Sequence, residues 1–370
     1  MKVKLKISTK KNILEFLKKN SKKRVLILTG KKSFFGSGAN KLFSNYKIIF
    51  KKKAYPEMEE LKEIYFQVKK FNPDILIAVG GGSVIDYAKI VSILNPNNIK
   101  KIKKDIQNNI QPSNLRNFFL VVIPTTAGSG AEITSNAVIY INQKKYSFEG
   151  RNLIPDKFFL CPFLVKKNPF KLKASSGFDA ISQSIESILS LKSNKSSVFF
   201  ATKSLEISIK NFIKFLYNKG SDSPAKMVLA AHLSGKAISI SKTIAPHAVS
   251  YPFTSIYGIS HGHAVSLNFE KFLYYNYKYL NLAKDDFDIR KRFNILLKVF
   301  DVNNITELCE KIKFFKTKAL LEDDFEKLGI NLSKDISSIL SGVNILRLKN
   351  NPIPLQKKDL KRIILGKIDK

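Results

Sequence analysis

The sequence predicts two domains: an α/β domain with a parallel sheet at residues 1–160, followed by an all-helical domain at residues 161–370. A chain of 370 residues is long enough to bury two separate cores. In the first part, apolar runs of strand length alternate with helix-like segments, which is typical of a parallel sheet covered by helices. Beyond about residue 165, amphipathic segments follow one another and strand-like runs nearly vanish, which indicates a helical domain.

The first domain contains four predicted strands. Short apolar runs place them at residues 24–29, 46–50, 75–79 and 117–126. A helix is expected at residues 57–71, where Glu comes early and Lys late, as the helix dipole favours. Another is expected from Asp86 to Leu94, directly after a glycine-rich turn. Strands that alternate with helices in this way favour a sheet with helices on both faces.

The second domain is expected to begin between Pro155 and Pro169, where the sequence texture changes. Its segments have the apolar periodicity of amphipathic helices. The predicted helices lie at residues 176–191, 196–217, 223–240, 263–282, 288–300, 304–313, 316–328, 334–343 and 357–365.

The formal net charge of +35 comes mostly from lysines scattered along the chain. A nucleic-acid-binding protein would concentrate its cations on one face and use arginine for base edges, so we expect no nucleic-acid partner. The positive field instead favours a small anionic substrate. No apolar run is long enough to cross a bilayer, the start lacks a signal-peptide pattern, and two cysteines cannot make a disulfide framework. We therefore expect no membrane partner and a cytoplasmic location.

Residues 246–263, PHAVSYPFTSIYGISHGH, hold three of the four histidines of the chain. His247 and His261 stand on either side of two expected chain breaks, Tyr-Pro and Tyr-Gly. Upstream, Asp179 and Gln183 are four residues apart and share one face of a predicted helix. A carboxylate, an amide and two imidazoles from separate segments can bind a divalent metal. The alternative is that the His-Gly pair only ends a helix.

Two glycine-rich loops follow predicted strands. Gly80-Gly81-Gly82-Ser83 precedes a helix, and glycines there let backbone N–H groups approach a pyrophosphate. The loop matches neither the dinucleotide fingerprint nor a Walker loop, so a plain tight turn is the alternative. The second loop, Pro124 to Gly130, adds hydroxyl groups after another strand. Adjacent loops of this kind at strand ends predict a site for a phosphate-bearing ligand.

The motifs VGGGSVIDYAKI, IPTTAGSGAEIT, FDAISQSIES and PHAVSYPFTSIYGISHGHAV together resemble the iron-containing (group III) alcohol dehydrogenase family. The resemblance follows the order of the family motifs over nearly the whole chain. It implies the dehydroquinate synthase-like fold, with a Rossmann-like NAD(P)-binding domain and a helical domain that binds metal and substrate. It also implies NADPH or NADH as cofactor, Fe²⁺ as the metal with Zn²⁺ as the alternative, and a homodimer.

The resemblance carries specific residues with it. Those implied to bind the cofactor are Gly80, Gly81, Gly82, Ser83, Asp86, Thr125, Thr126, Ser129, Thr134 and Lys145. The implied metal ligands are Asp179, Gln183, His247 and His261, where Gln183 departs from the usual histidine. Tyr251 and His263 are the implied proton-transfer residues, although His263 could instead cap or pack a helix. His232 is predicted to be a histidine of the core or of the surface. Glu186 is predicted either to contact a metal ligand without binding the metal itself or to be a surface carboxylate.

A narrower resemblance links residues 174–187 and 236–267 to the branch that includes phosphonoacetaldehyde reductases, which make 2-hydroxyethylphosphonate in phosphonate biosynthesis. Lys173 and Arg151 are candidate contacts for the substrate anion, or else solvated surface charges. The first strand ends in Gly30 instead of the acidic residue that many relatives have there. Since that acid repels the 2′-phosphate of NADPH, its loss favours NADPH.

Three other interpretations remain open at the level of sequence. A sugar-acid oxidoreductase, or one acting on another small aldehyde, would share both loops. A metal-free pseudoenzyme would keep nucleotide binding without turnover, and Gln183 is the residue that admits this possibility. A basic nucleic-acid binder would have salt-dependent affinity and no turnover.

Overall fold

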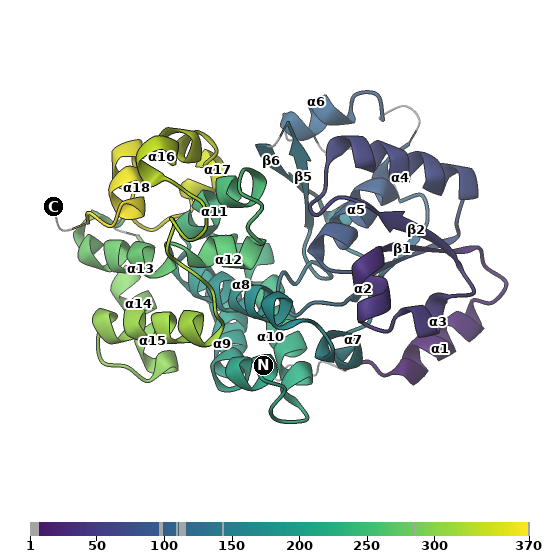
Figure 1. Cartoon of the computed structure of the whole chain (residues 1–370), viewed down its shortest axis with the longest axis horizontal. Helices are drawn as coiled ribbons and strands as arrows, with labels where there is room; N and C mark the ends of the chain where they lie inside the picture. The colour runs from purple at the N-terminus through teal and green to yellow at the C-terminus, as the bar shows by residue number, and fades with distance from the viewer. Residues whose placement is uncertain are drawn as a thin grey trace. The chain divides into compact units, whose positions relative to one another are not determined.

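The computed structural model describes residues 7–95, 99–108, 110, 116–142, 144–284 and 286–368 (Figure 1). The chain forms two compact units. The first comprises the residues up to Pro169 together with Pro224–Gly235, and the second comprises Phe170–Ser223 and the residues from Lys236 onward. Helix α10 (Ser223–Ser241) therefore contributes to both units, a feature that the sequence did not indicate.

The first unit contains a five-stranded parallel sheet with the order β2-β1-β3-β4-β7, and the predicted parallel α/β domain is confirmed. The strands are β1 (Val25–Gly30), β2 (Lys47–Lys51), β3 (Ile75–Gly80), β4 (Phe119–Pro124) and β7 (Lys157–Phe158). A separate antiparallel hairpin, β5 (Asn136–Ile141) and β6 (Lys144–Glu149), was not predicted. In β6 the charged residues Lys144, Lys145 and Glu149 mask the alternation of apolar side chains that marks a strand.

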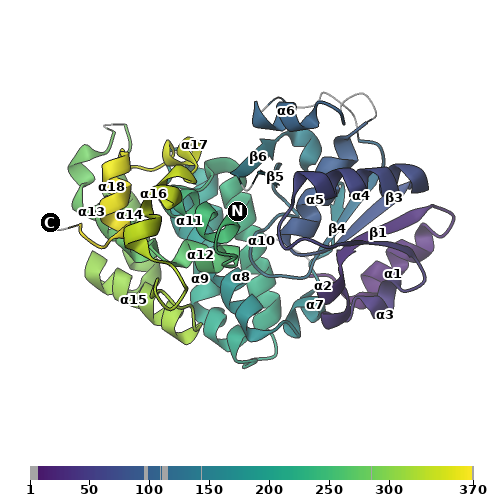
Figure 2. The ribbon, with the colours of Figure 1, turned by 45° about the horizontal axis from the view of Figure 1, so that its top comes forward.

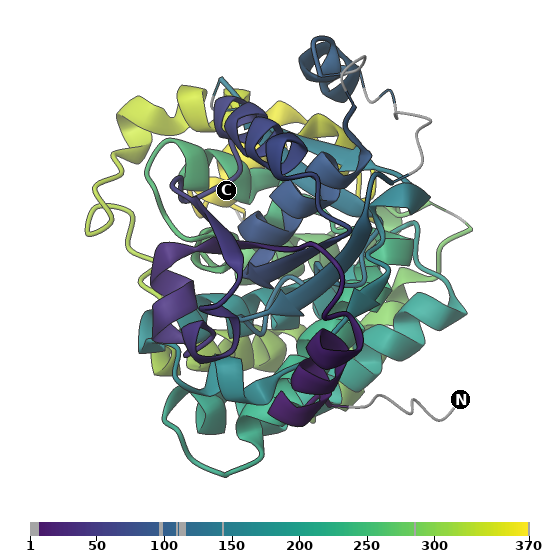
Figure 3. The ribbon, with the colours of Figure 1, turned by 90° about the vertical axis from the view of Figure 1, so that its right-hand side faces the viewer.

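Helices cover both faces of this sheet because successive strand residues point in opposite directions. Leu26, Leu28 and Leu76 belong to the core on one face, whereas Val25 and Ile27 belong to the core on the other. The first core includes residues of α4 (Met58–Phe71), α5 (Gly82–Ile93) and α6 (Ile102–Gln107) (Figure 2). The second includes residues of α1 (Lys10–Lys19), α2 (Lys31–Gly36), α3 (Asn40–Phe43) and α7 (Pro162–Lys166) (Figure 3).

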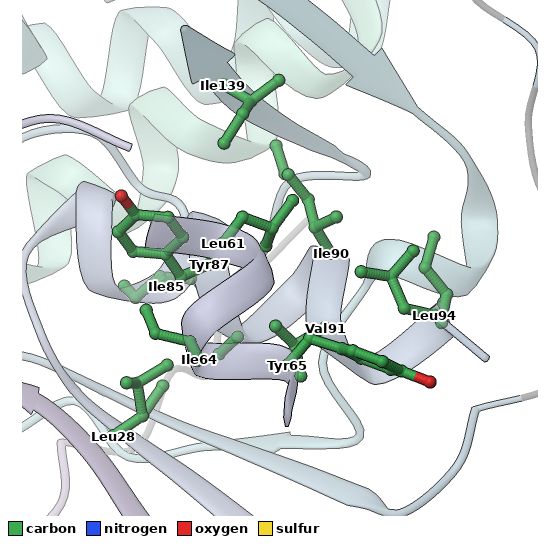
Figure 4. Close-up of a cluster of buried hydrophobic side chains, with 14 of the residues drawn as sticks. Leu28, Leu61, Ile64, Tyr65, Ile85, Tyr87, Ile90, Val91, Leu94 and Ile139 are labelled. Atoms are coloured by element: carbon green, nitrogen blue, oxygen red, sulfur yellow. The ribbon is translucent and has the colours of Figure 1, made fainter. Parts of the chain in front are cut away.

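The core under α4 and α5 is closely packed with aliphatic side chains (Figure 4). Leu28 of the sheet, Leu61 and Ile64 of α4, and Ile85 and Ile90 of α5 are almost fully buried there. Each such side chain contributes about 1.5–3 kcal/mol through its burial. Helix α5 begins at Gly82, four residues before the predicted start at Asp86, because the glycine-rich segment itself forms the first helical turn.

The second unit is helical, as predicted. Its helices, in addition to the end of α10, are α8 (Phe170–Leu189), α9 (Lys195–Leu216), α11 (Ala245–Ser255), α12 (His261–Ser266), α13 (Phe269–Lys278), α14 (Ile289–Phe300), α15 (Ile305–Lys318), α16 (Leu332–Ser341), α17 (Ile345–Leu348) and α18 (Lys357–Ile364). Asparagine side chains cap α9, α15 and α16 by accepting backbone N–H bonds. Among the described residues, no helix has both the length and the apolarity needed to cross a bilayer.

Two helix predictions in this unit were wrong. Residues 316–328 do not form a helix, because α15 continues to Lys318 and the following residues make turns. Leu320 and Gly329 have positive φ angles of 51° and 74° there, which ends the helical path. Residues 263–282 were expected as one helix but divide into α12 and α13, since Asn268 between them leaves the helical conformation.

Candidate metal centre and cofactor loops

Asp179, His247 and His261 meet in the second unit, although they belong to three different helices. Their ligand atoms all lie within 4.8 Å of one another. The Nε2 atom of His247 is 3.2 Å from the Asp179 carboxylate oxygen Oδ1, and the two imidazole rings are 5.2 Å apart between centroids. Asp179 and His247 are buried, and His261 is partly exposed. The group therefore has donor atoms that converge on one point.

Helix α11 presents His247 in spite of an internal proline. The predicted break at Tyr-Pro is absent, because the helix continues through Pro252 to Ser255. A proline has no N–H for the carbonyl four residues earlier, which here belongs to Ala248. That carbonyl accepts a hydrogen bond from the Asn344 N–H at 3.2 Å instead. The chain turns only at Tyr-Gly, where Gly258 has a φ of +68°.

Gly262 lets α12 bring His261 against α8. A Cβ atom at this position would lie 1.9 Å from the Ser175 carbonyl oxygen and 3.0 Å from Asp179 Cβ. A side-chain carbon cannot approach the backbone oxygen to 1.9 Å, so only glycine permits this approach. The Gly of the His-Gly pair thus has a packing role next to the candidate metal ligands.

Glu186 lies two turns after Asp179 on α8 and is fully buried. Its carboxylate accepts hydrogen bonds from the Ile244 N–H at 2.8 Å, the His247 N–H at 3.1 Å and His247 Nδ1 at 3.0 Å. Burial alone would lower the pKa of His247, but the negative charges of Glu186 and Asp179 together raise it to about 9. The surface alternative for Glu186 is therefore wrong.

Tyr251 follows His247 by one helical turn, and its ring is 6.1 Å from that of His261. Burial raises the pKa of Tyr251, while a hydrogen bond and positive charge from Arg347 oppose the rise. Arg347 is placed by α17, whose capping residue Asn344 accepts the Arg347 N–H at 3.0 Å. No motif around Arg347 indicated this position from the sequence.

His263 and Lys173 have other partners in the structure. The imidazole Nε2 of His263 lies 2.6 Å from the Glu322 carbonyl oxygen, which ties α12 to the segment after α15. Lys173 is 2% exposed, donates to Asn218 Oδ1 at 2.6 Å and lies over the Phe215 ring. These contacts favour packing roles for both residues.

The two glycine-rich loops of the first unit lie side by side, because they follow the adjacent parallel strands β3 and β4. A Cβ atom at Gly82 would lie 3.1 Å from the Ser129 hydroxyl, and one at Gly81 would lie 3.4 Å from a Thr126 methyl carbon. The buried Thr125 hydroxyl has no hydrogen-bond partner among the described residues. The N-terminus of α5 and this hydroxyl fit a phosphate-bearing cofactor.

Asp86 and Lys145 interact electrostatically in the first unit, where the positive charge of Lys145 favours the ionised form of Asp86. Burial raises the pKa of Asp86 to about 7, against the opposing effect of Lys89 and Lys145. Lys89 itself is fully buried and donates to the Thr134 carbonyl at 2.7 Å and to the Thr134 hydroxyl at 2.9 Å. Thr134 is thus held by Lys89, a residue to which the sequence analysis assigned no role.

Helix α10 packs against the second loop and holds it in place. The imidazole of His232 contacts the Glu132 carboxylate at 3.0 Å, and both side chains are buried. Gly130 and Gly235 touch closely, since a Cβ atom at Gly130 would lie 2.5 Å from Gly235 Cα. His232 is therefore a core histidine, one of the two alternatives predicted for it, and its partner Glu132 was not identified from the sequence.

Family models agree with this arrangement. The model described as "Iron-containing alcohol dehydrogenase" matches residues 5–162. The model described as "Fe-containing alcohol dehydrogenase family, C-terminal" matches residues 173–367. The chain belongs to the iron-containing alcohol dehydrogenase family. The family is one of NAD(P)-dependent oxidoreductases that act on CH–OH groups.

Individual relatives agree with this family. The chain is 30% identical over 222 residues to phosphonoacetaldehyde reductase of Streptomyces viridochromogenes, a match that spans 57% of this chain and only 55% of that enzyme. It is 27% identical over 312 residues to 4-hydroxybutyrate dehydrogenase of Clostridium kluyveri, spanning 82% and 81% of the two chains. Sulfoacetaldehyde reductase from Bifidobacterium kashiwanohense, solved with NAD⁺, has the same fold, with a TM-score of 0.83, 20% identity and coverage of 99% and 96%.

The donor set fits the metal for which the iron-containing alcohol dehydrogenases are named. Two histidines and one carboxylate are typical ligands of Fe²⁺, and they leave further coordination positions open. Gln183, which stands where the family resemblance implies a histidine, donates from Nε2 to Asp179 Oδ2 at 3.1 Å. The amide thus orients the carboxylate of a neighbouring candidate ligand.

Proposed function

We propose that this protein is a metal-dependent aldehyde reductase that uses NADPH or NADH to reduce phosphonoacetaldehyde to 2-hydroxyethylphosphonate, as a step of phosphonate biosynthesis. The convergence of Asp179, His247 and His261 on one point is the observation that carries the proposal. Gln183 is a weaker fourth candidate ligand, since an amide oxygen donates less strongly than an imidazole. When bound there, a divalent ion would polarise the carbonyl oxygen of the substrate.

The cofactor is assigned to the loops of the first unit. The backbone N–H groups of Gly81, Gly82 and Ser83 at the start of α5 would bind the pyrophosphate. Further contacts are proposed for Gly80, Asp86, Thr125, Thr126, Ser129, Thr134 and Lys145. When bound, NAD(P)H supplies the hydride, and the protein aligns the cofactor.

Tyr251 is the proposed proton donor. Tyr251 is four residues after His247 on α11 and so shares its helix face, and aldehyde reduction needs one proton for the new alcohol oxygen. Arg347 stabilises the hydroxyl after the proton has left, because it places a positive charge beside that oxygen. The Nε2 atom of His263 already contacts the Glu322 carbonyl, so we rank His263 second.

Arg347 also supports an anionic substrate. A guanidinium can bind a phosphonate through two parallel hydrogen bonds, and Arg347 is the cation that contacts Tyr251. Lys173 is committed to Asn218 and Phe215, and Arg151 is exposed. Both are weaker candidates than Arg347 for the anion contact.

The deciding experiment is an assay of purified protein, with and without added Fe²⁺, against phosphonoacetaldehyde, the aldehyde of 4-hydroxybutyrate and propanal with NADPH, and against a sugar-acid alcohol with NADP⁺. We expect Fe²⁺-dependent oxidation of NADPH and a kcat/KM at least about 100-fold higher for phosphonoacetaldehyde than for propanal, a difference of about 2.7 kcal/mol. Arg347→Gln should lower kcat/KM for phosphonoacetaldehyde much more than for propanal and so remove most of this preference, since the lost charge beside Tyr251 affects the reduction of both aldehydes. Equal kcat/KM values for both aldehydes would refute the substrate assignment.

The alternatives give different results in the same assay. A pseudoenzyme would turn over no substrate, and a different alcohol dehydrogenase would favour another member of the panel. The cytoplasmic location and the homodimer belong to this proposal as well. Light scattering of the purified protein tests the dimer, for which we expect twice the chain mass of 41.9 kDa.

A further inference from the structure

Glu186 makes contacts that a structural carboxylate would not need. Its two oxygens receive three N–H groups, from the Ile244 backbone, the His247 backbone and the His247 imidazole. The backbone contacts satisfy groups at the start of α11, which have no partner within their own helix. The contact with the imidazole adds nothing to this capping role, so it requires a separate explanation.

The geometry determines which nitrogen of His247 can bind a metal. Because Glu186 accepts a hydrogen bond from Nδ1, that nitrogen keeps its proton, and Nε2 is the nitrogen that remains to offer a lone pair to a metal. Nε2 is the atom that faces Asp179 at 3.2 Å. The same carboxylate oxygen, Oε1, contacts both the backbone and the ring of His247, so the ring cannot rotate without losing a hydrogen bond.

The charges agree with this arrangement. Two neutral imidazoles and the single carboxylate of Asp179 leave one positive charge of a divalent ion uncompensated. The buried charge of Glu186, on the far side of His247, supplies the balance, and a carboxylate behind a ligating histidine increases the basicity of the ring.

We propose that Glu186 is a positioning residue of the metal centre, which holds His247 with Nδ1 protonated and Nε2 directed at the ion. This inference rests on the proposed metal role of Asp179, His247 and His261. Removal of such an outer carboxylate typically weakens metal binding by about 10- to 100-fold.

The test measures Zn²⁺ affinity by competition with a chromophoric chelator, for full-length wild type, Glu186→Gln, His247→Ala and Glu270→Gln. Glu270 is the matched control, because it is also a buried carboxylate of the second unit but is paired with Lys316 at 3.0 Å. We expect Glu186→Gln to lose about 10- to 100-fold in affinity, His247→Ala to lose more, and Glu270→Gln to bind as wild type does.

The outcomes distinguish a failure of the role of Glu186 from a failure of the proposed metal centre. Wild-type affinity in Glu186→Gln, together with a loss in His247→Ala, would overturn the role of Glu186 alone. Wild-type affinity in His247→Ala would instead overturn the metal centre. An equal loss in Glu270→Gln would attribute the effect to general destabilisation and would equally refute the specific role of Glu186.

A second measurement does not depend on whether Glu186→Gln folds. The zinc-loaded wild type is labelled with ¹⁵N-histidine, and long-range ¹H–¹⁵N correlations report which ring nitrogen carries the proton. The chain has only four histidines, so the signal that disappears in His247→Ala identifies this residue. We expect a protonated Nδ1 and a metal-bound Nε2, and the opposite tautomer would overturn the inference.

Discussion

At the scale of single residues, Gln183 is the side chain that distinguishes the proposed metal centre from the histidine that the family resemblance implies. Gln183→His should increase Fe²⁺ or Zn²⁺ affinity, because imidazole is a stronger donor than an amide oxygen. The expected gain is on the order of tenfold, which corresponds to about 1.4 kcal/mol. Chelator competition measures it, with Ser182→Ala as a control on the same helix. Unchanged or weaker binding in Gln183→His would mean that this position does not face the ion.

Gly30 is the residue that we expect to determine the preference for NADPH over NADH. It ends β1, and a Cβ atom there would lie 3.2 Å from the Ser33 hydroxyl and 3.7 Å from Lys51 Cε. Gly30→Asp would therefore put a carboxylate among groups that favour the 2′-phosphate of NADPH. We expect the ratio of kcat/KM for NADPH to that for NADH to fall by about tenfold or more, or about 1.4 kcal/mol.

The control for this substitution is Gly36→Asp, which adds the same charge at an exposed position with no atom within 4 Å of the new Cβ. It should leave the cofactor ratio unchanged. A wild-type enzyme that uses NADH at least about tenfold better than NADPH would contradict the assignment of Gly30, since that ratio amounts to about 1.4 kcal/mol in the wrong direction.

Sequence patterns identified the candidate metal-binding residues better than the residues that hold functional side chains in place. His247 and His261 stood out because histidines are rare in this chain, and Asp179 because it shares a helix face with Gln183; the structure brings the three together. Glu132, Lys89 and Arg347 did not stand out among many charged residues. Their partners His232, Thr134 and Tyr251 are distant along the chain, and such contacts leave no local pattern, so only the fold could reveal them.

At the scale of elements, the approach of α12 to α8 determines where His261 lies. Gly262→Ala would force a methyl group against the Ser175 carbonyl, which a Cβ atom would approach to 1.9 Å. Overpacking of this kind costs about 1–3 kcal/mol. We expect that loss in the free energy of unfolding by denaturant titration, accompanied by weaker Zn²⁺ binding.

Gly36→Ala is the control for this element-scale prediction, because nothing lies within 4 Å of its added carbon. It should change neither stability nor metal binding. If Gly262→Ala also kept wild-type stability and affinity, close packing of α12 on α8 would not be what positions His261.

The same scale explains which elements the sequence could predict. The four long strands are continuous apolar runs and most long helices have strong periodic patterns, and these elements were located within a few residues. Helix α11 was missed because Pro252 normally ends a helix, whereas here the Asn344 N–H satisfies the Ala248 carbonyl that Pro252 leaves open. That compensation comes from residues almost a hundred positions away, beyond the reach of any local pattern.

At the scale of the whole molecule, the chain divides its proposed chemistry between two units. The cofactor loops belong to the first unit, and the metal group with Tyr251 and Arg347 belongs to the second. The sequence predicted this division from its change of texture. It did not predict that residues of α10 would group with the first unit, where His232 pairs with Glu132. The apolar pattern of a helix shows that one face is buried, but not against which core it packs.

The net charge of +35 is the whole-molecule property with the clearest kinetic consequence. A field of this sign attracts an anionic aldehyde and has no effect on a neutral one. Raising the ionic strength from 0.01 M to 0.1 M shortens the Debye length from about 30 Å to about 10 Å, so kcat/KM for phosphonoacetaldehyde should fall. Propanal is the control and should show no salt dependence. Parallel responses of the two aldehydes would mean that long-range attraction does not contribute, and a preference that persisted at high salt would then belong to direct contacts such as that of Arg347.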